Sequence, residues 1–285
     1  MLDDGRLVLG FLDDVRRLPV VVALSQPDGA GDVFGEIAST TSAGELSVIA
    51  TQIARILSLD HDAQGLAAVG ARDPMARALL EAAPGFRPVS FPSPYEAAVW
   101  GVLAQRISMP VAAAIKQRLA VATGTITAGW DRELHPSPAP ERLLDLRSFA
   151  GVSSEKLARL HAVALAALEG KLDAARLRAM PRALAIDELR GIHGVGPWTA
   201  EHILLRGCGV VDELPSHEPR LLRGIAELYG LPATPSAEEA GVIAEAWRPY
   251  RMWIAVLVVM NLRHTPRWHA ARGRPRATRH REVSA

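Results

Sequence analysis

Short apolar runs near the start of the chain have the length and alternation of β-strands. They predict three strands, at residues 6–11, 20–24 and 32–39. Ser42 and Glu45 are spaced as a capping box, which predicts a helix that continues to about Leu57. We therefore expect a small α+β domain with an antiparallel sheet over residues 1–90, and we identify no chemistry in it.

After the boundary segment Phe91-Pro-Ser-Pro94, the apolar positions take the spacing of amphipathic helices. The pattern predicts helices at residues 95–108, 110–122, 141–146, 153–169, 172–179, 183–191, 198–205, 219–229, 236–246 and 250–262. No internal repeat is apparent. The fold class is therefore mostly α, with a helical region over residues 91–264.

One helix connection has a distinctive sequence, Leu-Arg-Gly-Ile-His-Gly-Val-Gly-Pro-Trp-Thr-Ala at residues 189–200. Glycine allows a positive φ in the turn, and Pro197 suits the first turn of the next helix. The amides of the turn and of the new helix start can then face one anion, such as a phosphate. A plain helix connector would have a similar turn, but the full segment favours a helix-hairpin-helix that binds the DNA backbone.

Composition limits the class of protein. The 285 residues are 49% hydrophobic and 22% charged, with few aromatic side chains, which fits a globular helical protein. No apolar run reaches membrane length, and the first residues lack the pattern of a signal peptide, so we expect a cytoplasmic protein with no membrane partner. The single cysteine, Cys208, excludes a disulfide framework, a cysteine-based zinc site and a four-cysteine iron–sulfur cluster. Its apolar neighbours predict a packed thiol.

Positive charge is concentrated at the C-terminal end. The net charge is +1, yet residues 263–285 contain seven arginines and one glutamate. Residues 265–285 therefore predict a disordered basic tail. It could contact the DNA backbone or simply be solvated, and the sequence favours neither.

In order along the chain, several segments resemble the HhH-GPD base-excision DNA glycosylases, in particular the bacterial DNA-3-methyladenine glycosylase II (AlkA-like) branch. They are the helix segment at 91–108, the hairpin at 191–200, the loop at 212–215, and the closing segments at 223–230 and 247–253. The resemblance covers about residues 45–262, and residues 1–44 resemble a shortened N-terminal domain of the family. It implies a fold of two helical lobes. It also implies a monomer that flips a damaged base out of double-stranded DNA.

The catalytic position departs from the family pattern. An aspartate follows the loop proline by three residues in the family, and this position is Glu218 here. A carboxylate beside the sugar would stabilise the positive charge that develops as the N-glycosidic bond breaks. The extra methylene of glutamate could displace the carboxylate by about an ångström, and such a misplacement can cost about a hundredfold in rate. Two alternatives remain: a protein that binds lesions without excising them, or catalysis by Asp212, Glu213 or His217.

The resemblance also assigns the base pocket and the DNA contacts. Five side chains are expected around the flipped base: Tyr95, Trp198, His202, Tyr250 and Trp253. Core packing is the alternative for the aromatic residues. DNA contacts are expected from Gln105, Arg106, Ile107, Gly194, Val195, Gly196 and Thr199, where Gln105 to Ile107 would fill the gap left by the flipped base. The backbone carbonyls of Arg190, Ile192 and Val195 match positions that hold a monovalent cation (Na⁺ or K⁺) in the family.

The residue after the hairpin separates two reaction types. Bifunctional relatives have a lysine two residues after the second hairpin glycine, and this position is Trp198 here. No lysine follows Lys171, so a Schiff base from this site is not expected. Together with the resemblance, this implies a monofunctional glycosylase for alkylated purines that needs no cofactor and acts in the first step of base excision repair, in the cytoplasm near the nucleoid. The sequence does not specify which lesions would be removed. Besides the enzyme and the lesion-binding protein, a third hypothesis is a helical scaffold that uses the hairpin to bind other proteins.

Overall fold

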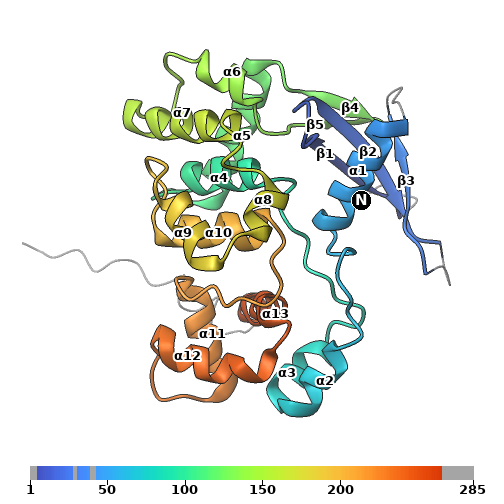
Figure 1. Cartoon of the computed structure of the whole chain (residues 1–285), viewed down its shortest axis with the longest axis vertical. Coiled ribbons are helices and arrows are strands. Elements are labelled where there is room, and N and C mark those ends of the chain that lie inside the picture. The colour runs from blue at the N-terminus through green and yellow to red at the C-terminus, as the bar shows by residue number, and fades with distance from the viewer. Residues whose placement is uncertain (1–4, 28–30, 39–42, 265–285) are drawn as a thin grey trace, which may run out of the picture.

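The computed structural model (Figure 1) describes residues 5–27, 31–38 and 43–264. These residues fold around three hydrophobic cores. The N-terminal core lies under an antiparallel sheet with the order β1-β2-β3. Its elements are β1 (Leu7–Leu12), β2 (Pro19–Ser25), β3 (Phe34–Ile37) and helix α1 (Ala43–Ile56). Alternate residues of β2, such as Val20 and Val22, pack into this core with Ile49 and Ile56 of α1. The three predicted strands are therefore confirmed.

A second, two-stranded sheet extends this region. It consists of β4 (Thr127–Gly129) and β5 (Arg132–Leu134). A Cβ at Gly10 would lie 2.7 Å from the Cβ of Leu134, so the missing side chain lets the hairpin approach β1 closely. The hairpin was not expected, because strands of this length leave no periodic pattern in the sequence.

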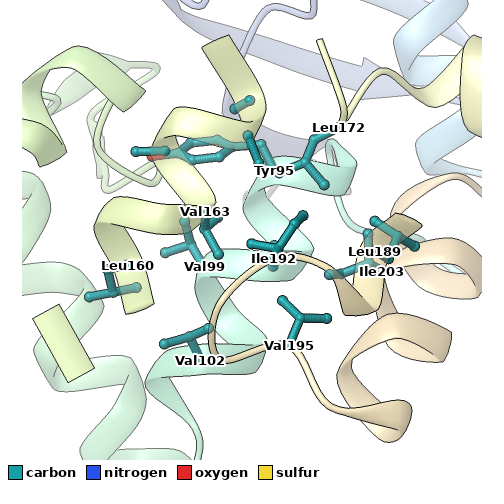
Figure 2. Packing of buried hydrophobic residues seen from close by; sticks show 14 of the residues in the cluster. Tyr95, Val99, Val102, Leu160, Val163, Leu172, Leu189, Ile192, Val195 and Ile203 are labelled. Atoms are coloured by element: carbon teal, nitrogen blue, oxygen red, sulfur yellow. The ribbon is translucent and has the colours of Figure 1, made fainter. Parts of the chain in front are cut away.

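The first helical lobe is built around α4. Its elements are α4 (Pro94–Leu103), α5 (Met109–Thr123), α6 (Pro140–Leu144), α7 (Ser154–Leu168), α8 (Ala174–Ala179), α9 (Arg182–Arg190), α10 (Pro197–His202) and the π-helix η1 (Ile203–Gly207). Nearly all residues of α4 are buried, because it packs against α7, α10 and η1 at once. Figure 2 shows how Val99 and Val102 meet Leu160 and Val163 of α7 in this core.

The second helical lobe combines two segments that are far apart in the sequence. Its elements are α2 (Leu66–Arg72), α3 (Pro74–Glu81), α11 (Pro219–Tyr229), α12 (Ala237–Ala244), the 3-10 helix η2 (Glu245–Trp247) and α13 (Arg251–His264). A Cβ at Gly224 would lie 2.6 Å from Val258 Cγ1, so α11 and α13 are in close contact. Residues 66–81 belong to this lobe by packing, although the sequence pattern places them in the same N-terminal domain as the sheet.

The predicted helices from residue 94 onward are present, with differences at their ends. Helix α4 stops at Leu103, five residues before the expected end, because the chain turns at Arg106, which has a φ of +61°. The helix predicted over residues 198–205 becomes a π-helix at Ile203. The capping residue Ser42 and the basic tail at 265–285 lie outside the described residues.

Candidate active site in the interlobe cleft

A cleft of about 540 Å³ lies where the two helical lobes meet. Helix α10 and η1 form one wall, and the segment at residues 86–89 and the loop at residues 215–220 complete it. The opposite wall is the apolar face of α13: Met252, Ala255, Val256, Val259 and Met260. A cleft with one apolar wall and a few charged groups is suited to a flat organic ligand.

The glycine-rich segment forms the turn expected of a helix-hairpin-helix. Helix α9 ends at Arg190 with Gly191 as its C-cap, and Gly194 has a φ of +87°, where a Cβ would lie 2.5 Å from Arg159 Cγ. The amide of Val195 donates to the carbonyl of Ile192 at 3.0 Å, and the side chains of both residues point into the first-lobe core (Figure 2). The hairpin is thereby fixed to the lobe and leads directly into α10, which carries Trp198 and His202 into the cleft.

Glu218 occupies the start of α11, at the edge of the cleft, and its carboxylate accepts four hydrogen bonds. Oε1 accepts the backbone amide of Arg220 at 3.0 Å and its Nε at 2.8 Å, and Oε2 accepts Arg220 Nη2 at 2.9 Å. The indole Nε1 of Trp198 donates to Oε2 at 3.1 Å. One carboxylate therefore caps a helix, pairs with an arginine and contacts the ring that follows the hairpin.

These contacts keep Glu218 ionised. Burial alone would raise the pKa of Glu218, but the hydrogen bonds and the positive charge of Arg220, with the Trp198 indole, hold this pKa below its ordinary value. An ionised carboxylate in a fixed position can stabilise a nearby cation without having to be reoriented. A group held in this form is poorly suited to donate a proton at neutral pH.

Two stacked rings lie beside Glu218, and a third ring meets one of them edge-on. The rings of Trp198 and His202 are parallel, with centroids 4.9 Å apart and 9° between their planes. Phe91 meets His202 edge-on at 5.0 Å. Burial, together with the charge of Arg206, lowers the pKa of His202 to about 4, so this imidazole is neutral at pH 7. The stack gives the cleft a rigid, uncharged aromatic platform.

The other candidate acids are in ion pairs away from the cleft. The Asp212 carboxylate forms ion pairs with Arg248 and Arg251 at 2.8 Å each, and the Glu213 carboxylate forms one with Arg182 at 3.0 Å. Neither lines the cleft. His217 is 54% exposed and lies 3.1 Å from Glu201. Among the acids singled out from the sequence, the structure brings Glu218 alone to the cleft.

Three of the expected pocket residues are core residues instead. Tyr95 is buried in the first lobe, where its hydroxyl donates to the carbonyl of Pro138 at 2.7 Å. Tyr250 and Trp253 pack against each other in the second lobe, 5.4 Å between ring centroids. None of the three lines the cleft, since on α13 the residues on the other side of the helix do so. Their placement corrects the expectation, and the physical reason is that large aromatic rings are needed to fill both cores.

Of the residues expected to contact DNA, three lie in the turn after α4, whereas Thr199 is buried. Gln105, Arg106 and Ile107 lie in the turn after α4, where Arg106 is exposed and Ile107 packs against the core. The Gln105 side chain donates to the carbonyl of Gly194 at 3.0 Å, so this turn is tied to the hairpin. Thr199 is buried, and a Cβ on Gly101 would lie 2.9 Å from its Cγ2, so its side chain faces α4 rather than a ligand outside.

Sequence reasoning missed Arg220 and Glu201. Arg220 is a solvent-facing position by helical spacing, and no pattern signals that its side chain turns back to Glu218. Glu201 is buried on α10 and accepts Arg182 at 2.9 Å and the amide of His217 at 3.0 Å, which fixes the loop before Glu218. The sequence pattern could have identified Glu201, because it is an acidic residue at a position that helical periodicity assigns to the interior.

The remaining groups bear on cofactors. Burial raises the pKa of the Cys208 thiol to about 12, so the prediction of a packed thiol is confirmed. Within the described part of the chain, no group of three or more His, Cys, Asp or Glu side chains is arranged to hold a metal ion. The carbonyls of Arg190, Ile192 and Val195 belong to the hairpin, and their role as ligands of a monovalent cation stays a prediction. None of the described helices is both long and apolar enough to cross a membrane.

Comparison with known proteins agrees with this geometry. No protein-family model matches the chain. A protein of Mycobacterium tuberculosis named "Probable bifunctional transcriptional activator/DNA repair enzyme AlkA" is 32% identical over 225 residues, which is 77% of this chain and 44% of the relative. A Bacillus subtilis protein named "DNA-3-methyladenine glycosylase" is 25% identical over 199 residues, which is 68% of this chain and 66% of the relative. This chain thus spans less than half the length of the mycobacterial relative.

The fold has a close solved counterpart. The 3-methyladenine DNA-glycosylase from Archaeoglobus fulgidus superposes with a TM-score of 0.77 and 20% identity, covering 93% of this chain and 90% of that one. At this identity the comparison establishes the shared fold. Sequence and fold thus agree with the resemblance found in the motifs: the chain is similar in sequence to these DNA repair proteins and shares the fold of a 3-methyladenine DNA-glycosylase.

Proposed function

We propose that this protein is a monofunctional DNA glycosylase that releases alkylated purines from double-stranded DNA. The observation that carries the proposal is the Glu218 carboxylate, which is held at the cleft by Trp198 and Arg220 next to the hairpin. The name of the Bacillus subtilis relative supports this activity, and the name of the mycobacterial relative supports a role in DNA repair. Such an enzyme would act in the cytoplasm, on chromosomal DNA, as a first step of base excision repair.

The chemistry follows from the charges. As the bond between the base and C1′ breaks, the sugar gains positive charge, and the ionised Glu218 carboxylate would stabilise it. Water then adds to C1′ and loses a proton, which leaves an abasic site and the free base. The Trp198–His202 stack offers a surface for the extruded base. The hairpin amides would bind a DNA phosphate, with or without a monovalent cation at the carbonyls of Arg190, Ile192 and Val195.

A lesion-binding protein without excision is the second candidate. The observation in its favour is the four hydrogen bonds that already occupy Glu218, because the Arg220 guanidinium offsets the negative charge that a developing sugar cation would need. This candidate predicts tight, salt-dependent binding to damaged duplex DNA with no release of base.

Base release separates the two. Purified protein is incubated with duplexes that contain either 7-methylguanine or ethenoadenine, and the released bases are separated by chromatography. Glu218→Gln removes the charge at the cleft, and Glu213→Gln is the matched control because it removes a nearby carboxylate that does not line the cleft. We expect release by the wild type and by Glu213→Gln but not by Glu218→Gln. Lesion binding without release by the wild type would refute the enzyme.

A further inference from the structure

The cleft carries more positive than negative side chains. Its charged lining consists of Arg87, Arg206 and Arg220 against Glu201 and Glu218. Glu201 is 4% exposed and is matched by Arg182 at 2.9 Å, from outside the lining, and Glu218 is matched by Arg220. Both carboxylates of the lining are therefore already paired with arginines, which reduces their attraction for a cationic base.

Glu218 and Arg220 form a fixed pair of opposite charges at the edge of the cleft. The separations are 2.8 Å to Nε and 2.9 Å to Nη2, and the Arg220 side chain is 37% exposed while that of Glu218 is 13% exposed. A guanidinium has five N–H donors, and two of them contact Glu218 here. Its remaining donors belong to a group that lines the cleft, so a ligand there can accept from the same arginine.

The two classes of damaged purine differ in how charge moves when they leave. A purine alkylated at a ring nitrogen carries a positive charge and departs as a neutral base. A purine without formal charge, such as ethenoadenine or hypoxanthine, keeps the electron pair of the broken bond and departs as an anion. In the second case the sugar becomes positive while the base becomes negative, and a carboxylate beside an arginine can stabilise both charges at once.

We propose that Arg220 is a specificity-determining residue that favours damaged purines without formal charge over cationic ones, by donating hydrogen bonds to the departing base anion. The proposal rests on the proposed glycosylase function of the same site. In the step, the bond between C1′ and the purine nitrogen breaks with both electrons on the base. A water oxygen then bonds to C1′, and the proton that this water loses balances the proton that the base anion takes up from solvent. The products are the free base and an abasic site.

The test compares two lesions in the same duplex sequence, ethenoadenine as the uncharged base and 7-methylguanine as the cationic one. Single-turnover rates are measured for each and divided by the rate of spontaneous loss, because cationic bases depart faster without an enzyme. Arg220→Gln removes the charge but keeps a polar side chain, and Arg220→Lys keeps the charge without the guanidinium fork. Arg142→Gln on the exposed surface of α6 is the control for loss of one positive charge.

We expect the wild type to accelerate loss of ethenoadenine more than loss of 7-methylguanine. Arg220→Gln should slow ethenoadenine release by about a hundredfold, the typical effect of removing one donor to a developing anion, and should leave 7-methylguanine release within a few-fold. Arg220→Lys should release ethenoadenine at a rate between those of the wild type and Arg220→Gln, and Arg142→Gln should release both bases at the wild-type rates. Thermal unfolding of each variant excludes loss of the fold as the cause.

Different results would overturn different claims. Equal slowing of both lesions by Arg220→Gln, or a larger effect on 7-methylguanine, would show that Arg220 only positions Glu218 and would overturn the proposal. A wild type that accelerates loss of 7-methylguanine more than that of ethenoadenine would overturn it as well. Release of neither base by the wild type would instead refute the proposed function on which the inference rests.

Discussion

Asp73 holds together parts of the second lobe that are far apart in the sequence, and its removal should be unusually destabilising. Its carboxylate caps α3 by accepting the amides of Met75 at 2.8 Å and Ala76 at 3.3 Å. It also accepts the indole Nε1 of Trp247 at 2.8 Å and the hydroxyl of Tyr229. Because Asp73 is only 5% exposed, water cannot take over its role in these contacts. We predict that Asp73→Ala destabilises the protein far more than loss of a helix cap alone.

The magnitude follows from the contacts. Loss of an aspartate cap costs about 1 kcal/mol. Without Asp73, the Trp247 indole can still donate to the Tyr229 oxygen, which lies 3.1 Å away, but the Tyr229 hydroxyl then has lost its acceptor. Tyr229 is half-buried and loses a hydrogen bond to a charged group, which contributes about 1.5–3 kcal/mol, so the total is about 3 kcal/mol. Burial and the hydrogen bond to Asp73 raise the pKa of Tyr229, so its hydroxyl stays a donor at neutral pH.

Asp173 provides a matched control, because it caps α8 through a single contact, from the amide of Arg176 at 2.7 Å, and is exposed. Asp173→Ala should therefore cost only about 1 kcal/mol. Urea denaturation followed by tryptophan fluorescence and by circular dichroism measures both variants, and agreement between the two probes tests two-state unfolding. Equal destabilisation by the two substitutions would refute the reasoning that Asp73 joins α3 to Tyr229 and Trp247.

Three further predictions concern the site and its supports. Gly207→Ala should destabilise the protein by about 1–3 kcal/mol, because the new Cβ would lie 2.7 Å from the backbone Cα of Pro94, whereas Gly241→Ala, with nothing within 4 Å, should not; thermal unfolding compares them. The depressed pKa of Glu218 predicts that the stabilisation from its ion pair is present above the ordinary value of 4.5 and is lost as the pH falls through the lower folded-state pKa; unfolding measured at descending pH should show this loss, and Arg220→Gln should remove it. Lys156→Met should weaken duplex binding without loss of fold, because Lys156 Nζ donates to the carbonyls of Leu103 at 2.9 Å and Gln105 at 3.0 Å and so fixes the turn that carries Arg106. Fluorescence anisotropy at several salt concentrations measures the binding, and unchanged affinity would contradict the role of this turn.

The sequence could predict features that depend on local spacing. The three N-terminal strands, the helices from residue 94 onward and the turn at Gly194 follow from periodicity, proline and glycine, which act over a few residues, whereas the short hairpin of β4 and β5 does not. It could not predict that residues 66–81 join the second lobe, because that packing depends on contacts with α13, far along the chain. Aromatic residues at helical spacing also could not be assigned to the cleft or to the core. Tyr250 lies just before α13 and Trp253 lies in its first turn, close in sequence to Met252 and Val256, and only the rotation of the helix decides which of these side chains face the cleft.

The glutamate at position 218 has a structural explanation that its sequence context did not suggest. As a helix cap it needs to reach only the amide of Arg220, and aspartate is a preferred residue for that role whereas glutamate is not. The longer side chain lets the same carboxylate reach the Arg220 guanidinium and the Trp198 indole, which lie on different elements. The extra methylene thus allows one group to join the start of α11 to the helix that follows the hairpin. Glu218→Asp should keep the cap but lose the contact with Trp198. Glutamate at this position and arginine at position 220 therefore act together, because the longer side chain lets the carboxylate contact both Arg220 and Trp198.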